Sequence, residues 1–120
     1  MPAAKTLTDP DVLAAYDAMI AGVPGVVRKG ATIPYTSING NMYSSISKAN
    51  VIGLRLGKDD LAAFLAAYDT TLFEALPGFF QKEYVAVPAT LFTDIEALHA
   101  WFQKSHAFAS GLRAKKTTRS

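Results

Sequence analysis

The sequence predicts a two-layer α+β protein, in which three helices pack against an antiparallel sheet of four to five strands. Asn39-Gly40 separates two stretches rich in Ser, Tyr and Ile, which is typical of a β-hairpin. Segments 9–22, 59–68 and 93–112 carry apolar residues at helical spacing. Because these helices alternate with strand-like segments along the chain, we expect them to cover one face of the sheet.

Composition and charge limit the possible classes of function. The 120 residues, 50% hydrophobic and 18% charged, indicate one globular domain, with an ordered core over about 9–112 and a solvated basic tail at 113–120. The absence of cysteine excludes disulfides and thiolate metal sites, and favours a cytoplasmic location. No apolar run is long enough to cross a membrane, so we expect no membrane contact. The net charge of +2, which owes much to the tail, argues against nucleic acid as a partner.

The first half of the chain contains a helix followed by a three-stranded meander. Asp9 is the expected N-cap of the first helix, with Pro10 in its first turn. A type I′ turn needs positive φ at both central residues, which Asn and Gly tolerate best. The two-residue loop at 39–40 then predicts a hairpin, and residues 51–56 follow as a third strand after a turn at 48–50.

The hairpin turn also predicts the strand register. A two-residue loop places Ser37 opposite Met42 and Tyr35 opposite Ser44.

The second half contains a helix, further strands and a closing helix. Asp59 and Asp60 suit the N-terminus of the second helix, where negative charge is favourable. Residues 72–76 indicate a weak strand or an irregular segment, and Phe79-Phe80 and residues 83–87 indicate one or two further strands. Of Phe79 and Phe80 we expect one to be buried and one to be partly exposed.

The closing helix has its own start signal and buried face. Thr93 and Glu96 have the spacing of a capping box. Trp101 flanks the apolar side, and we expect it to be at least half buried against the sheet. The residues predicted to be buried are Ile95, Leu98, Phe102, Ser105, Ala109 and Leu112.

No residue pattern indicates a catalytic, metal or cofactor site. His99 and His106 lie two helical turns apart, too far to chelate one metal alone. Asp59 and Asp60 are consecutive on a helix, so their carboxylates diverge and cannot share a proton. The serines lack the Gly-x-Ser-x-Gly context of a nucleophile elbow. We therefore expect no enzymatic activity, no cofactor and no metal.

The hairpin supplies the candidate interaction residues. If the helices cover the Met42 face, then Thr36, Ile38 and Tyr43 point outward together and form an interface, most simply in a homodimer. The alternative is that the first helix or the later strands cover this face, which makes these residues core. A different function is a small-molecule pocket between sheet and helices. The side chains expected to line such a pocket are Tyr35, Tyr43 and Phe80.

Five short motifs follow one another along the chain: Val-Pro-Gly-Val at 23–26, Asn-Gly-Asn-Met-Tyr at 39–43, Leu-Arg-Leu at 54–56, Tyr-Val-Ala-Val-Pro at 84–88 and the helix with Trp101. Their order over about residues 11–112 resembles the TfoX N-terminal domain family. The resemblance implies a compact α+β fold similar to secretion-chaperone-like domains, which often pair as dimers. It implies a non-enzymatic regulatory or protein-interaction domain, without catalytic residues or cofactor and with an unknown protein partner. The family's Met-Phe-Gly motif is missing near residues 30–33, and Asn41 and Tyr43 replace its usual Lys and Phe.

Overall fold

The computed structural model describes residues 9–30, 34–76 and 78–112 and confirms the predicted α+β class. The predicted helices all form, with ends that differ by a few residues, and the basic tail at 113–120 lies outside the described residues. In chain order the elements are α1 (Pro10–Ile20), β1 (Tyr35–Ile38), β2 (Asn41–Ile46), β3 (Ile52–Arg55), α2 (Lys58–Ala67), β4 (Leu72–Leu76), β5 (Phe79–Val87), the 3-10 helix η1 (Ala89–Thr93) and α3 (Ile95–Ser110).

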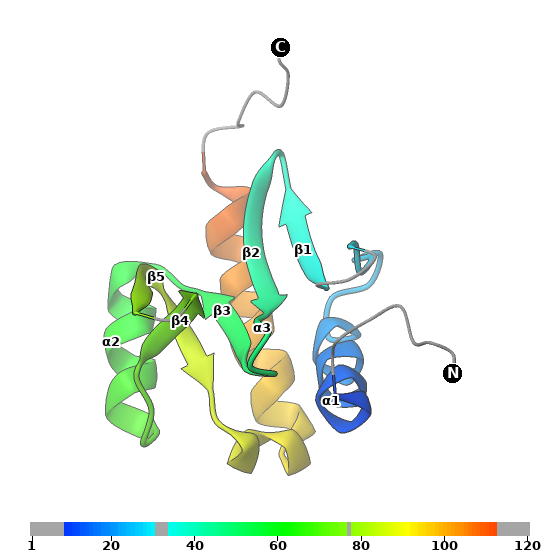
Figure 1. Ribbon diagram of the computed structural model, residues 1–120. Coiled ribbons are helices and arrows are strands. Elements are labelled where there is room, and N and C mark those ends of the chain that lie inside the picture. The colour runs from blue at the N-terminus through cyan, green and yellow to red at the C-terminus, as the bar shows by residue number, and fades with distance from the viewer. Residues whose placement is uncertain (1–8, 31–33, 77, 113–120) are drawn as a thin grey trace.

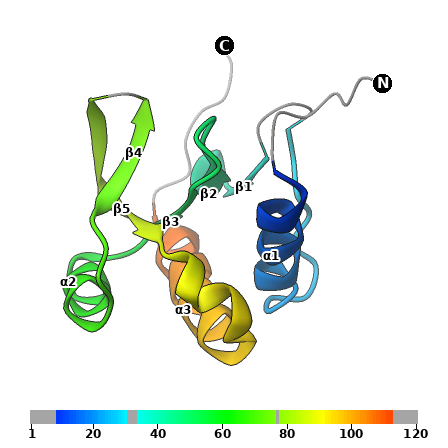
Figure 2. The same cartoon turned by 60° about the horizontal axis from the view of Figure 1, so that its bottom comes forward.

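The strands form one antiparallel sheet in the order β1-β2-β3-β5-β4. The first three strands are the predicted meander (Figure 1). Residues 79–87 form a single long strand, which pairs with β3 on one side and with β4 at the sheet edge on the other. The three α-helices lie on one face of the sheet, with α3 between α1 and α2 (Figure 2).

The hydrophobic core lies between the sheet and α3. The central strand contributes Ile52 and Leu54, and α2 contributes Phe64, all of which are fully buried. The spacing predicted for α3 is confirmed for four of its residues, whereas Ile95 at its first turn is exposed. The buried residues of α3 are Leu98, Phe102, Ser105 and Ala109.

The hairpin turn has the predicted backbone conformation. Asn39 has φ of 54° and Gly40 has φ of 80°, as a type I′ turn requires. Next to the turn, Ser37 pairs with Met42 as the loop length predicts.

One residue further along, a β-bulge changes the register of β1 and β2. Thr36 pairs with Ser44, and Tyr35 pairs with Ser45. The predicted pairing of Tyr35 with Ser44 is therefore wrong by one residue. Tyr43 is the extra residue of β2 at this bulge, and such an insertion redirects side chains locally.

The last helix begins one residue later than its sequence motif predicts. Thr93 ends η1, and the N-cap of α3 is Asp94, whose carboxylate accepts a hydrogen bond from the Ala97 N–H at 3.2 Å. The predicted capping box of Thr93 and Glu96 is thus wrong, because the preceding 3-10 turn already contains Thr93.

Candidate functional site

A pocket of about 380 Å³ lies between the loop that follows α1, the first two strands and α3. Small-molecule sites in proteins typically have volumes of about 300–1,000 Å³. The described residues that line the pocket are 24–27 of the loop, Lys29, Ser37, Ile38, Tyr43 and His106.

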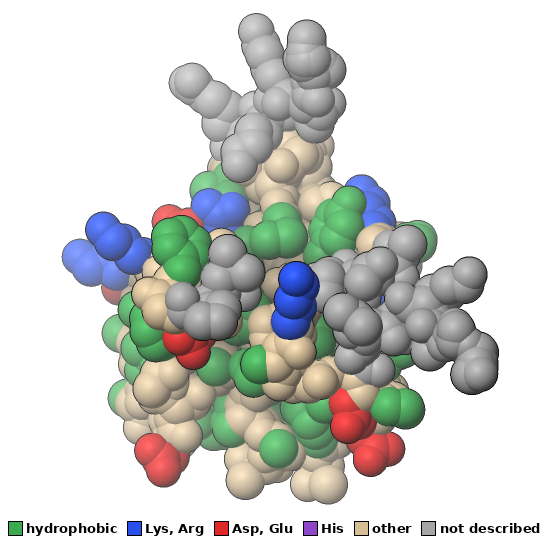
Figure 3. All heavy atoms as spheres, in the orientation of Figure 1, with side chains coloured by type: hydrophobic (Ala, Val, Ile, Leu, Met, Phe, Trp, Pro, Cys, Tyr) green, Lys and Arg blue, Asp and Glu red, His purple; other side chains and the backbone are tan. Residues whose placement is uncertain are grey.

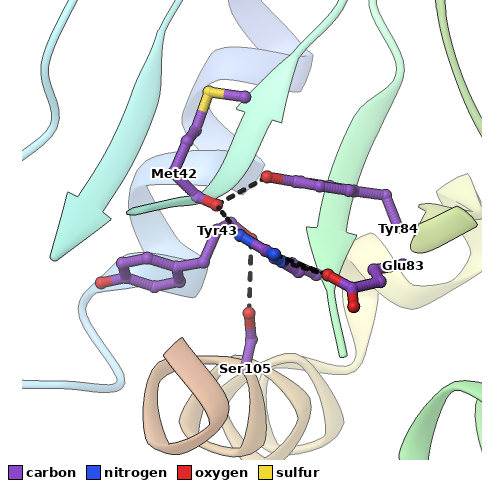
Figure 4. Close-up of polar contacts among 6 residues, drawn as sticks. Met42, Tyr43, Glu83, Tyr84 and Ser105 are labelled. Atoms are coloured by element: carbon purple, nitrogen blue, oxygen red, sulfur yellow. Dashed lines mark hydrogen bonds and ion pairs between the residues drawn. The ribbon is translucent and has the colours of Figure 1, made fainter. Parts of the chain in front are cut away.

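Tyr43 forms an inner wall of this pocket and does not face outward as predicted. Its side chain is only 1% exposed, and its ring packs against Phe102 and His106 of α3, with ring centroids 5.5 and 5.6 Å away. The Ser105 hydroxyl donates to the Tyr43 carbonyl at 3.3 Å (Figure 4). Thr36 is also fully buried. The interface predicted at Thr36 and Tyr43 is therefore wrong, and the alternative that these two residues belong to the core is confirmed, because the helices cover their face of the sheet.

Ile38 is the third residue of the predicted patch. It is partly buried against the core and also lines the pocket.

The backbone just before Tyr43 is anchored from β3 and β5. The described ladder between β2 and β3 ends before Met42. The Met42 carbonyl instead accepts hydrogen bonds from the Tyr84 hydroxyl at 2.6 Å and from Arg55 Nη1 at 3.3 Å (Figure 4). Arg55 is itself held by Glu83, with Nη2 2.6 Å from Oε1. Because a carbonyl that is partly withdrawn from water needs a partner, these side chains replace the missing ladder bonds and hold the wall in place.

A cluster of hydroxyl groups under the hairpin connects this wall to α1. The Ser44 hydroxyl lies 2.6 Å from the Tyr16 hydroxyl and also hydrogen bonds with Thr36. Ser44 and its neighbour Tyr43 thus both reach the helices, because the bulge interrupts the alternation of side chains. Burial raises the pKa of the Tyr16 phenol above its usual value, although the bond to Ser44 opposes this shift. Burial also raises the pKa of Tyr43, so both phenols are neutral at physiological pH.

Lys29 supplies the positive charge at the pocket. Its backbone forms an isolated bridge with Tyr35, through N–H to carbonyl distances of 2.8 and 3.0 Å. Its Nζ donates a hydrogen bond to Ser37 Oγ at 3.0 Å. Within the described ranges, no carboxylate lies within ion-pair distance of Lys29, whereas the adjacent Arg28 pairs with Asp17 at 2.8 Å.

The two histidines of α3 have different surroundings. His99 Nε2 donates to the Ala18 carbonyl at 2.8 Å and joins α3 to α1. His106 lines the pocket with its ring edge toward Tyr43, at an interplanar angle of 76°. No described residue hydrogen bonds to the His106 ring nitrogens, so they are available to a ligand.

Only one of the predicted pocket residues lines this pocket. Tyr43 does, whereas Tyr35 and Phe80 are not among its described lining residues. Phe79 and Phe80 are 58% and 50% exposed, so the prediction that one of them is buried is wrong. The reason is that the hairpin of β4 and β5 extends away from the helices (Figure 2).

Sequence reasoning missed the polar residues of the pocket. These residues are Lys29 from a loop, Ser37 from a strand and His106 from a helix, and His106 lies far from the other two in the sequence. No local motif joins them. The only local signal was the Pro24-Gly25 turn, which marks an irregular segment after a helix.

The described residues contain no group of three or more His, Asp or Glu side chains that could hold a metal ion. Among the described helices, none combines the length and the apolar character that a membrane span requires.

Comparison with known proteins does not place this chain in a family. No protein-family model matches it, and neither a curated protein nor a solved structure matches it significantly. The resemblance to the TfoX N-terminal domain family therefore stays a prediction from the order of its motifs.

Proposed function

We propose that this protein is a non-enzymatic domain that binds a small molecule in the pocket beside Tyr43. We also propose a cytoplasmic location, which the lack of cysteine favours. The observation that carries the binding proposal is the convergence of Lys29, Ser37, Tyr43 and His106 on one cavity of about 380 Å³. A concave site with an apolar lining and a few converging polar groups is the usual form of a ligand site.

The pocket wall is built in a way that supports binding. Tyr43 is held by ring contacts and by the Ser105 hydroxyl, and Lys29 is held by its bridge to Tyr35. A wall that is already ordered loses little conformational entropy when a ligand binds, which favours affinity.

A serine hydroxyl beside a lysine amine can also act as a nucleophile and its base. Catalytic lysines of this kind are desolvated, whereas Lys29 is exposed. The pair of Lys29 and Ser37 therefore supports recognition of a ligand better than catalysis.

The test is a ligand-detected NMR screen of a fragment library against three proteins. Val27 lines the pocket and is 69% exposed, so Val27→Trp should fill the pocket without disturbing the core. Ala62 is exposed on α2, and Ala62→Trp adds the same side chain elsewhere. Fragments should bind the wild type and Ala62→Trp, and should lose binding to Val27→Trp. Equal binding to all three proteins would contradict the proposal.

A second candidate function is a protein-interaction or regulatory domain of the TfoX N-terminal type, acting as a homodimer. The observation that favours it is the pair of exposed aromatic residues Phe79 and Phe80 on β5, beside the edge strand β4. On the face shown in Figure 3, hydrophobic side chains reach the surface in separate places, with charged side chains among them. Adjacent exposed aromatic residues beside a sheet edge are suited to pairing with a second copy.

Sedimentation velocity distinguishes this second function. The double variant Phe79→Asp, Phe80→Asp should convert a wild-type dimer into a folded monomer. Ile95→Asp is the matched control, because Ile95 is also an exposed apolar residue but lies at the start of α3. A wild type that remains monomeric at high micromolar concentration contradicts the homodimer.

A further inference from the structure

The charge at the pocket is not balanced within the described part of the protein. Lys29 is the only described lining residue with a permanent charge, and no described carboxylate pairs with it. The nearby Arg28, by contrast, has a carboxylate partner, because it pairs with Asp17 at 2.8 Å. A ligand with a negative charge would supply the missing partner.

The hydrogen bond between Lys29 and Ser37 leaves further donors of both side chains unused. Ser37 Oγ accepts from Lys29 Nζ at 3.0 Å, so the Ser37 hydroxyl hydrogen is available to another acceptor. The remaining N–H groups of the ammonium are available as well. These neighbouring donors match the oxygens of one carboxylate group.

The rest of the pocket is suited to an apolar body. Val26, Val27 and Ile38 line it, and the exposed fraction of Val27, at 69%, is the largest among the exposed large hydrophobic residues described. Covering such a side chain with a hydrocarbon chain is favourable because apolar surface leaves water. The edge-on pair of Tyr43 and His106 closes the inner end.

The number of cationic side chains that line a site indicates which class of anion the site can bind. Phosphate sites typically combine arginine forks or several cations with backbone N–H groups at a helix N-terminus or glycine-rich loop. Among the described lining residues, the pocket instead has one permanently charged side chain, Lys29, which is hydrogen bonded to the hydroxyl of Ser37. One positive charge beside an apolar wall matches a monoanion with a hydrocarbon part.

We infer that the pocket takes a small organic carboxylate, whose carboxylate group binds Lys29 and Ser37 while its apolar body packs on Val26, Val27 and Ile38. This inference rests on the proposed function, since it names the ligand class of the same pocket.

The experiment compares hexanoate with hexanamide, a neutral molecule of nearly the same shape, by amide NMR titration of the full chain. Hexanoate should cause saturable shifts at pocket residues and bind at least about tenfold more tightly than hexanamide, since hydrogen bonds to charged groups are the stronger ones.

Variants test the roles of the two polar residues. Lys29→Met should remove the preference for hexanoate while hexanamide binding stays unchanged. Ser37→Ala should weaken hexanoate binding by a smaller factor. Lys58→Met is the control, because Lys58 is an exposed lysine on α2, on the far side of α3 from α1.

The outcomes separate this inference from the function on which it rests. Equal affinity of hexanoate and hexanamide at the pocket, unaffected by Lys29→Met, would overturn the carboxylate but leave the pocket as a binding site. If hexanoate and every fragment of the library leave the pocket resonances unchanged, both the inference and the proposed function fail.

Discussion

Tyr16 shows how a single residue can link a fold to pH. Its phenol is fully buried and hydrogen bonds to Ser44, and burial raises its pKa. The folded protein therefore keeps Tyr16 protonated at a pH where an unfolded tyrosine, with a pKa of about 10, has ionised. The free energy of unfolding must then fall as pH rises above the unfolded pKa.

Tyr16→Phe tests this linkage. At pH 8 the variant should be less stable by about 1 kcal/mol, because one hydrogen bond is lost while Ser44 keeps its bond to Thr36. Above pH 10 the free energy of unfolding of the wild type should fall by about 1.4 kcal/mol per pH unit for each buried tyrosine. In the variant this fall should be smaller, because the contribution of Tyr16 is absent. Urea unfolding at several pH values should therefore show the difference shrinking. A difference that does not change with pH would mean that Tyr16 ionises equally in both states.

Gly53 is required by the ring that covers it. A Cβ at this position would lie 2.6 Å from two ring carbons of Phe73, which is itself only 2% exposed. Gly53→Ala should therefore destabilise the protein by about 1–3 kcal/mol, as overpacking usually does. Thermal unfolding measures the effect.

Two controls accompany the Gly53 prediction. Gly111→Ala should cost little, because the nearest atom to its added Cβ is 3.6 Å away. The penalty of Gly53→Ala should also be smaller in a Phe73→Leu background, since the two residues are in contact. An equal penalty in both backgrounds would show that Phe73 is not the cause.

At the scale of elements, the ends of helices and strands are decided by their neighbours. α3 begins at Ile95 with Asp94 as its cap, because η1 places Thr93 in a preceding turn. β2 continues past the end of its ladder with β3, because Asn41 and Met42 remain paired with β1. On the other edge, side chains of β3, β5 and α3 satisfy the carbonyl groups of Met42 and Tyr43.

The cap of α3 can be tested with adjacent substitutions. Asp94→Ala should lower the free energy of unfolding by about 1 kcal/mol, since it removes an N-cap. Thr93→Ala should cost clearly less, because no hydrogen bond of the Thr93 side chain caps α3 in the structure. Urea unfolding of both variants measures the difference. A larger loss for Thr93→Ala would restore the capping box predicted from the sequence.

At the scale of the whole molecule, Trp101 reports how α2 and α3 are joined. It is partly buried as predicted, and its partners include Phe64 of α2 and Tyr68, the residue that caps the end of α2. Its ring lies edge-on to Phe64 at 4.9 Å, and its Nε1 donates to the Tyr68 hydroxyl at 3.1 Å. Its environment therefore depends on the packing of two helices.

We predict blue-shifted Trp101 fluorescence in the native protein, with an unfolding transition in urea that coincides with the loss of far-UV circular dichroism. One core that connects both helices to the sheet should unfold cooperatively. Loss of the fluorescence signal at lower urea than the dichroism would show that α2 separates first.

Local chemistry in the sequence determined much of this fold. The positive φ at Asn39 and Gly40, the cap at Asp9 and the buried positions of α3 follow from turn preferences and helical spacing, which act over a few residues. The same is true of the α+β class, because amphipathic helices between strands must cover a sheet.

Only the tertiary structure decided which face of the hairpin is buried and where the pocket lies. A single-residue bulge at Tyr43 directs two consecutive side chains toward the helices, and period-two reasoning cannot foresee it. Lys29, Ser37 and His106 belong to three separate elements, and the packing of α3 on the sheet brings them together. Local signals act over a few residues, whereas this site is lined by Lys29 and His106, which lie 77 positions apart in the sequence.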